Sequence, residues 1–211
     1  MYPNKFSRFS KIINRQLVPL ISLAKIYNPR IDEIIYSNKY DRKIYTGYMS
    51  CGLLSYLLSY QIKNLYPNIK LTPGYSYIGY GKYLEDHTCI IYHYKNEKII
   101  IDPTYKQFLD SIYCDGKSDY SKYLYAELPN IFVGTKEDIR YLVNKLSELE
   151  LKLYSDTSYN TEDILDMWKF NGESRYEFNL NDLVKQLNIQ NSENAGLNRL
   201  FQYIKSQKID N

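Results

Sequence analysis

The stretch that decides the fold is HTCIIYHYKNEKIIIDPT, residues 87–104. Two apolar runs rich in β-branched and aromatic residues flank a short polar centre, Lys-Asn-Glu. The pattern predicts two antiparallel strands, 87–94 and 98–102, joined by a tight turn. Because an antiparallel pair folds the chain back on itself, we expect His87 to lie opposite or near Asp102.

His87 is the better placed of the two histidines for chemistry. It follows the acidic pair Glu85-Asp86 at the start of its strand, where a side chain reaches a cleft, whereas we expect His93, near the turn, at the surface. An Asp102 carboxylate beside His87 fixes the ring tautomer and leaves the other nitrogen for a nucleophile. Taken alone, an aspartate before a proline is an ordinary strand-ending residue.

Cys51 is the nucleophile that fits this pair. Leucine and isoleucine recur at helical spacing up to residue 65, and Ser50 is a good N-cap, so we expect a helix over 50–65 with Cys51 in its first turn. Free backbone N–H groups at a helix start stabilise a thiolate and an oxyanion. A lone cysteine in an apolar helix is more often a small core residue, but its position before Gly52 favours the catalytic interpretation.

The remaining chain predicts an α+β protein of one domain, 1–211, with a catalytic core over about 40–134 and a C-terminal helical extension over about 135–211. Thr135 followed by Asp138 resembles a capping box. We expect further helices over 6–27 (bent or split at Pro19), 31–37, 135–154, 161–169, 180–188 and 194–206, strands over 69–80 and 131–133, and loops over 38–47, 155–160 and 171–176.

Composition excludes several classes of protein. The 211 residues include 44% hydrophobic and 24% charged side chains, which is typical of a globular domain. The net charge of +3 is too low for a typical nucleic-acid-binding module. The 25 Tyr against 7 Phe and 1 Trp fit an AT-rich coding sequence without any functional selection.

The cysteine and histidine counts argue against disulfides and metals. Three Cys make an odd number without paired spacing, and two His without a C-x-x-C motif argue against a structural zinc site. We therefore expect neither metal nor cofactor. The early apolar run 17–24 is broken by a proline and is far too short to span a membrane. These features predict a cytoplasmic protein, in a host cell or a virion if the source is viral.

The predicted site resembles that of the transglutaminase-like branch of the papain-type thiol enzymes. Its members are Cys51 at a helix start, His87 on a strand and Asp102 on the next strand. The motif GYMSCG at 47–52 and the strand–turn–strand ending in Asp-Pro-Thr carry the resemblance, which covers about residues 45–108. It implies a papain/transglutaminase-like core, with the nucleophile on a helix N-terminus packed on a small antiparallel sheet, plus C-terminal helices. It also implies acyl chemistry on protein amides: proteolysis, isopeptide cleavage, glutamine deamidation or transamidation.

The sequence departs from that family at two positions. Many members carry an aromatic residue two places after the histidine, where this chain has Cys89, which we expect to be a buried core thiol. The papain-type glutamine before the nucleophile is replaced by Tyr45, so Tyr45 or Tyr48 is the candidate second oxyanion donor. Cys114, in a polar stretch, is interpreted as an incidental thiol.

A second class of function stays open. A non-catalytic structural or protein-interaction protein with the same fold would suit the high tyrosine content and the helical C-terminus. Four tyrosines before the His87 strand form either a rim that binds a polypeptide or a strand with half-exposed aromatics, and Trp168 is interpreted as a packing anchor. The expected partner is a protein or peptide substrate, without specific nucleic acid. The four tyrosines are Tyr75, Tyr77, Tyr80 and Tyr83.

Overall fold

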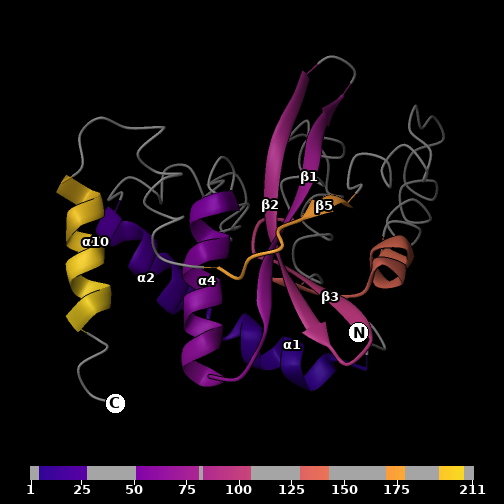
Figure 1. The fold of residues 1–211 in the computed structure, drawn as a ribbon, viewed down its shortest axis with the longest axis horizontal. Coiled ribbons are helices and arrows are strands. Elements are labelled where there is room, and N and C mark those ends of the chain that lie inside the picture. The colour runs from indigo at the N-terminus through magenta and orange to yellow at the C-terminus, as the bar shows by residue number, and fades with distance from the viewer. Residues whose placement is uncertain are drawn as a thin grey trace, which may run out of the picture.

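The computed structural model describes residues 5–27, 51–80, 83–105, 129–142, 170–178 and 195–206. Within these ranges five strands form one antiparallel sheet, in the order β4-β3-β2-β1-β5 (Figure 1). Helices α2, α4 and α10 gather beside the sheet, and α2 contacts both of the others. The chain is a mixed α+β protein, as the sequence predicts.

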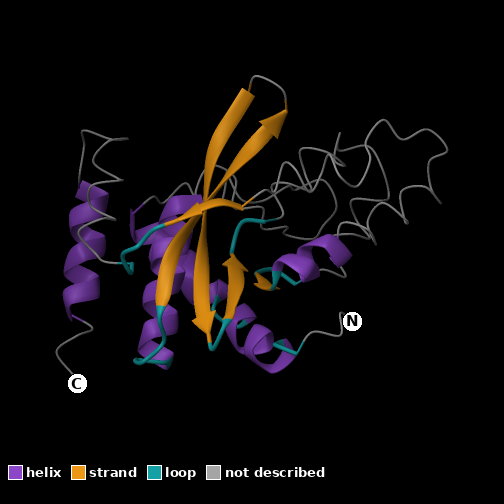
Figure 2. Cartoon of the chain, turned by 45° about the vertical axis from the view of Figure 1, so that its right-hand side comes forward, coloured by secondary structure: helices purple, strands orange, loops and turns teal. Residues whose placement is uncertain are grey.

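The predicted hairpin forms the centre of the sheet. It consists of β2 (Tyr83–Tyr94) and β3 (Glu97–Asp102), and β1 (Leu71–Tyr80) pairs with β2 over residues 83–92. Glu97 pairs with Tyr94, so the turn has two residues rather than three, and Lys95 adopts the left-handed φ of 54° that such a turn uses. Strand β2 also begins earlier than expected, and the β1–β2 ribbon extends beyond the other strands (Figure 2).

Two short strands complete the edges. Strand β4 (Phe132–Gly134) pairs with β3 and begins one residue later than expected. Strand β5 (Phe170–Glu173) pairs with β1, so the loop expected over 171–176 is wrong for its first three residues. The chain after residue 134 therefore contributes a strand to the sheet as well as the expected helix α10 (Ala195–Ser206).

The N-terminal helical region is split, but not at Pro19. Helix α1 (Ser7–Asn14) and helix α2 (Leu17–Tyr27) are separated by a turn at residues 15–16. Pro19 instead lies in the first turn of α2, where a backbone N–H has no partner within the helix. Proline is tolerated there, so the break falls before it.

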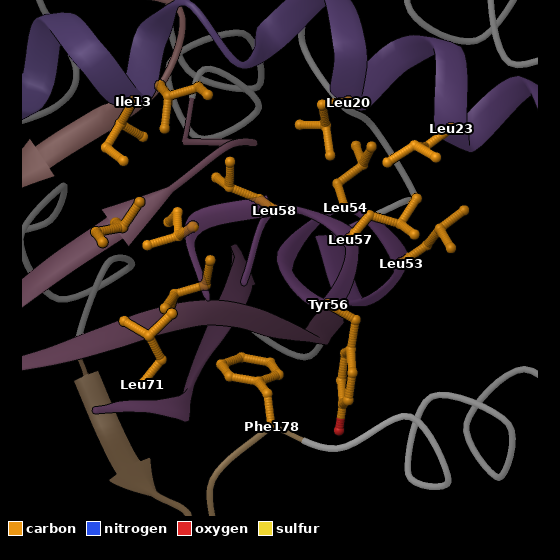
Figure 3. Close-up of a cluster of buried hydrophobic side chains, with 14 of the residues drawn as sticks. Ile13, Leu20, Leu23, Leu53, Leu54, Tyr56, Leu57, Leu58, Leu71 and Phe178 are labelled. Atoms are coloured by element: carbon orange, nitrogen blue, oxygen red, sulfur yellow. The ribbon is translucent and has the colours of Figure 1, made fainter. Parts of the chain in front are cut away.

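Helix α4 (Cys51–Leu65) matches its expected range and buries most of its side chains. Leu54 and Leu57 lie next to Leu20 and Leu23 of α2 (Figure 3). On another side, the ring of Tyr56 meets that of Phe178 edge to face, with centroids 4.7 Å apart. The hydrophobic core thus holds the helix that begins at Cys51 against both α2 and the sheet.

The capping box at Thr135 is present and starts a helix over 136–142. The Thr135 N–H donates to Asp138 Oδ2 over 2.7 Å, and the Asp138 N–H donates back to Thr135 Oγ1 over 3.3 Å. No helix in the described part of the chain has the length and apolar character needed to cross a membrane. The following expected features lie outside the described residues: the helices at 31–37, 161–169 and 180–188, the loops at 38–47 and 155–160, Ser50 and Trp168.

Candidate active site

Cys51 is the first residue of α4 and is partly exposed. One turn further along the helix, the buried Ser55 hydroxyl donates to the Thr88 carbonyl over 2.9 Å. This hydrogen bond ties the start of α4 to β2 at the residue after His87. Sequence reasoning missed Ser55, because a serine within an apolar helix does not by itself indicate a partner on a strand.

His87 and Asp102 meet in the interior of the protein. Ile101 pairs with Ile90, so Asp102 continues the register beside residue 89 and lies diagonally from His87 on the same face. His87 Nε2 donates to Asp102 Oδ2 over 2.7 Å, and both side chains are completely buried. The expected contact is therefore present.

The third member of the predicted site is in contact with the same ring. The Cys51 side chain lies within hydrogen-bonding reach of His87, where it helps to raise the pKa of the ring. Because Asp102 occupies Nε2, the nitrogen left for the thiol is Nδ1. The structure thus brings Cys51, His87 and Asp102 together in the order thiol, imidazole and carboxylate.

Two opposing effects set the protonation of His87. Burial is the largest and lowers the pKa, because a dry interior disfavours the charged ring. The Asp102 charge, its hydrogen bond and the contact with Cys51 together outweigh burial and raise the pKa from 6.5 to about 9. His87 is therefore an imidazolium at neutral pH, with an acidic partner on each side.

The second oxygen of Asp102 is also engaged. Thr104 donates twice to Oδ1, through its N–H over 2.8 Å and its hydroxyl over 3.2 Å. The neighbouring Tyr105 is completely buried, and its pKa is raised well above the usual value by burial and by the Asp102 charge. The carboxylate thus lies in a dry environment with hydrogen-bond donors on both oxygens.

Cys89 lies beside this site but has the character of a core residue. It is 2% exposed, and its pKa is raised well above the usual value, first by burial and then by the charges of Asp102 and Cys51. A thiol in that environment stays protonated and unreactive. The expectation of a buried core thiol is confirmed, whereas Cys114 lies outside the described residues.

A second polar cluster surrounds Glu173 on β5. Its carboxylate accepts from Thr72 Oγ1 over 2.6 Å, from His93 Nε2 over 2.5 Å and from Lys98 Nζ over 2.6 Å. His93 is therefore half-buried in an ion-pair network rather than a simple surface residue. No group of three His, Cys, Asp or Glu side chains suited to a metal occurs within the described ranges.

Tyrosines were expected near the thiol, as candidates for a second oxyanion donor and as strand aromatics. Tyr45 and Tyr48 lie outside the described residues, and the backbone N–H groups of the first turn of α4 have no acceptor within the helix. Tyr75 is 38% exposed, which fits a half-exposed strand aromatic. The side chains of Tyr77, Tyr80 and Tyr83 lie outside the described set.

Comparisons with protein-family models, with curated proteins and with solved structures find no match to this chain. Three features of the described site bear on function. The thiol begins a helix, the imidazole is buried beside it, and the carboxylate holds the far side of the ring.

Proposed function

We propose that this chain is a cysteine-dependent amide hydrolase or acyltransferase that acts on protein substrates through Cys51, His87 and Asp102. The observation that carries the proposal is the buried His87 ring, held by a carboxylate at Nε2 and in contact with the Cys51 thiol. An imidazolium next to a thiol favours the thiolate, which is the nucleophilic form. The position of Cys51 at the start of α4 supports the same role.

In the proposed reaction, the Cys51 sulfur attacks the carbonyl carbon of a substrate amide. A C–S bond forms, and the carbonyl oxygen becomes an oxyanion that backbone N–H groups at the start of α4 stabilise. His87 gives its proton to the amide nitrogen, the C–N bond breaks, and the amine leaves a thioester on Cys51. Water or a second amine then attacks the thioester, His87 accepts the proton, and the Cys51 thiolate is released.

The acceptor determines which enzyme class results. Water gives a protease, an isopeptidase or a glutamine deamidase, and an amine gives a transamidase. We also propose that the core is papain/transglutaminase-like, which is supported by a thiol helix anchored on β2 and by His87 and Asp102 on adjacent strands. Of the three side chains only Cys51 is partly exposed, so substrate approaches from the sulfur side.

Thiol labelling tests the proposal directly. Iodoacetamide is added to the native protein at several pH values, and mass spectrometry follows each cysteine peptide. We expect Cys51 to react at least about tenfold faster than Cys89, and His87→Gln to slow Cys51 by about tenfold or more. His93→Gln is the matched control, because it removes the other imidazole in a cluster held by Glu173.

Folding is checked separately, since His87 is completely buried. Circular dichroism identifies the folded variants, and Asp102→Asn gives a second way to disturb the same ring. If Cys51 reacts at the wild-type rate in both variants, the thiol enzyme proposal is wrong and a non-catalytic role is favoured. Ammonia release, new N-termini and amine incorporation, each compared with Cys51→Ser, distinguish deamidase, protease and transamidase.

A further inference from the structure

The residues after β3 form a tight turn built around the Asp102 carboxylate. Thr104 donates to Asp102 Oδ1 twice, from its N–H over 2.8 Å and from its hydroxyl over 3.2 Å. His87 Nε2 donates to the other oxygen, Oδ2, over 2.7 Å. All three side chains are completely buried.

This arrangement limits how the carboxylate can turn. A carboxylate in water rotates easily about its terminal torsion, because any orientation finds water donors. In a dry interior, each oxygen needs a protein donor, and rotation would break bonds to both His87 and Thr104 at once. Pro103 strengthens the constraint, since its fixed φ favours the turn that brings the Thr104 N–H back to the aspartate.

We propose that Thr104 is a positioning residue of the thiol site: its two hydrogen bonds hold the Asp102 carboxylate so that Oδ2 points at His87 and the ring presents Nδ1 to Cys51. This inference rests on the proposed function, because it assigns Thr104 to the same site. In the proposed chemistry Thr104 takes no part in bond making or breaking; it acts through Asp102. Its neighbour Tyr105 is anchored elsewhere, by a hydrogen bond to the Pro129 carbonyl.

Two substitutions separate this role from a general contribution to the fold. Thr104→Val keeps the shape of the side chain and the backbone N–H but removes the hydroxyl, whereas Thr104→Ser keeps both donors. We expect Thr104→Val to slow iodoacetamide labelling of Cys51 about tenfold, as loss of a hydrogen bond to a charged group implies, and Thr104→Ser to recover most of the wild-type rate. The His87 pKa, followed by NMR titration, should fall in Thr104→Val and stay near wild type in Thr104→Ser.

The outcomes distinguish this inference from the proposed function. If Cys51 in Thr104→Val is labelled within about twofold of the wild-type rate, while its labelling in His87→Gln is slow, Thr104 has only a structural role and the thiol site stands. If His87→Gln is also unaffected, the proposed function itself fails. Should Thr104→Val not fold, wild-type hydrogen exchange decides: a Thr104 amide that exchanges much faster than those of β3 overturns the inference, and equal protection supports it.

Discussion

Replacing Asp102 by asparagine is predicted to lower the pKa of His87 and to change how stability depends on pH. The substitution keeps the size of the side chain and an oxygen that can accept the Nε2 proton, but it removes the negative charge. The perturbation removes the charge and also replaces one of the two accepting oxygens by an NH2 group, at a position where both partners are completely buried.

The size of the effect follows from the His87 environment. Its pKa is raised from 6.5 to about 9, and at about 1.4 kcal/mol per pH unit this difference corresponds to about 3 kcal/mol. Burial is the largest cause and acts in the opposite direction, so without the Asp102 charge only Cys51 and a weaker, neutral hydrogen bond at Nε2 oppose it. We expect the pKa of His87 in Asp102→Asn to be 6.5 or below.

Stability should follow the same titration. A histidine whose pKa is higher in the folded than in the unfolded protein contributes its full stabilisation below pH 6.5, and loses it as pH rises through about 9. Wild-type protein should therefore lose about 3 kcal/mol from this group between pH 6.5 and about 9. In Asp102→Asn that loss should be absent, so the difference in unfolding free energy between the two proteins shrinks with rising pH.

Two measurements check this reasoning. NMR titration reports the two histidines separately, and His93→Gln assigns the signals because it removes one of them. Urea unfolding of both proteins at a series of pH values from 6 to 10 gives the difference in free energy. A wild-type His87 that titrates near 6.5, or a difference that stays constant across this range, would refute the charged His87–Asp102 pair.

Three further predictions concern the framework around the site. Ser55→Ala should lower the free energy of unfolding by about 1–2 kcal/mol and slow labelling of Cys51; an unchanged labelling rate would limit the hydroxyl to a structural role. Gly196→Ala should lower the melting temperature, with a cost of about 1–3 kcal/mol, because the new Cβ would overlap the Tyr27 carbonyl oxygen; an unaltered melting temperature contradicts the close contact of α10 with α2. Glu173→Gln should cost about 1–3 kcal/mol at pH 7. Burial raises the pKa of Glu173, but its hydrogen bonds and the nearby lysine and histidine charges lower it overall. The difference in unfolding free energy between wild type and Glu173→Gln should therefore disappear as pH falls below 4.5, which unfolding measured at acidic pH checks.

The sheet centre was predictable because local signals and tertiary structure agree there. Alternating β-branched and aromatic residues around Lys95 specify a hairpin, and a hairpin places residues 87 and 102 together whatever the rest of the chain does. Helix α4 was equally predictable, since its apolar spacing and its end at Leu65 are local features. The same logic failed at Pro19, because the proline was expected to break the helix although the first turn tolerates it.

What could not be predicted depends on partners distant in sequence. Strand β5 contains Asn171 and Gly172, which disfavour strands, and it forms because β1 offers an edge to pair with. Ser55 bonds to a carbonyl that no helical pattern reveals. Thr104 is the intermediate case: an Asp-Pro-Thr sequence predicts that a side chain folds back on its own turn, but only the sheet shows that this aspartate also meets His87.

In the proposed reaction, the pKa of His87 depends on the chemical state of Cys51. His87 keeps a raised pKa in a dry environment because two acidic groups oppose the effect of burial, and one of them is Cys51. In the proposed thioester, the Cys51 sulfur no longer exchanges a proton with His87, and Asp102 alone opposes the effect of burial. We therefore expect the pKa of His87 to fall at that stage, which favours a ring that accepts a proton from water over one that donates a proton to the leaving amine. In the proposed reaction, Asp102 and Thr104 keep the ring in place throughout, while the state of Cys51 sets the balance between acid and base in His87.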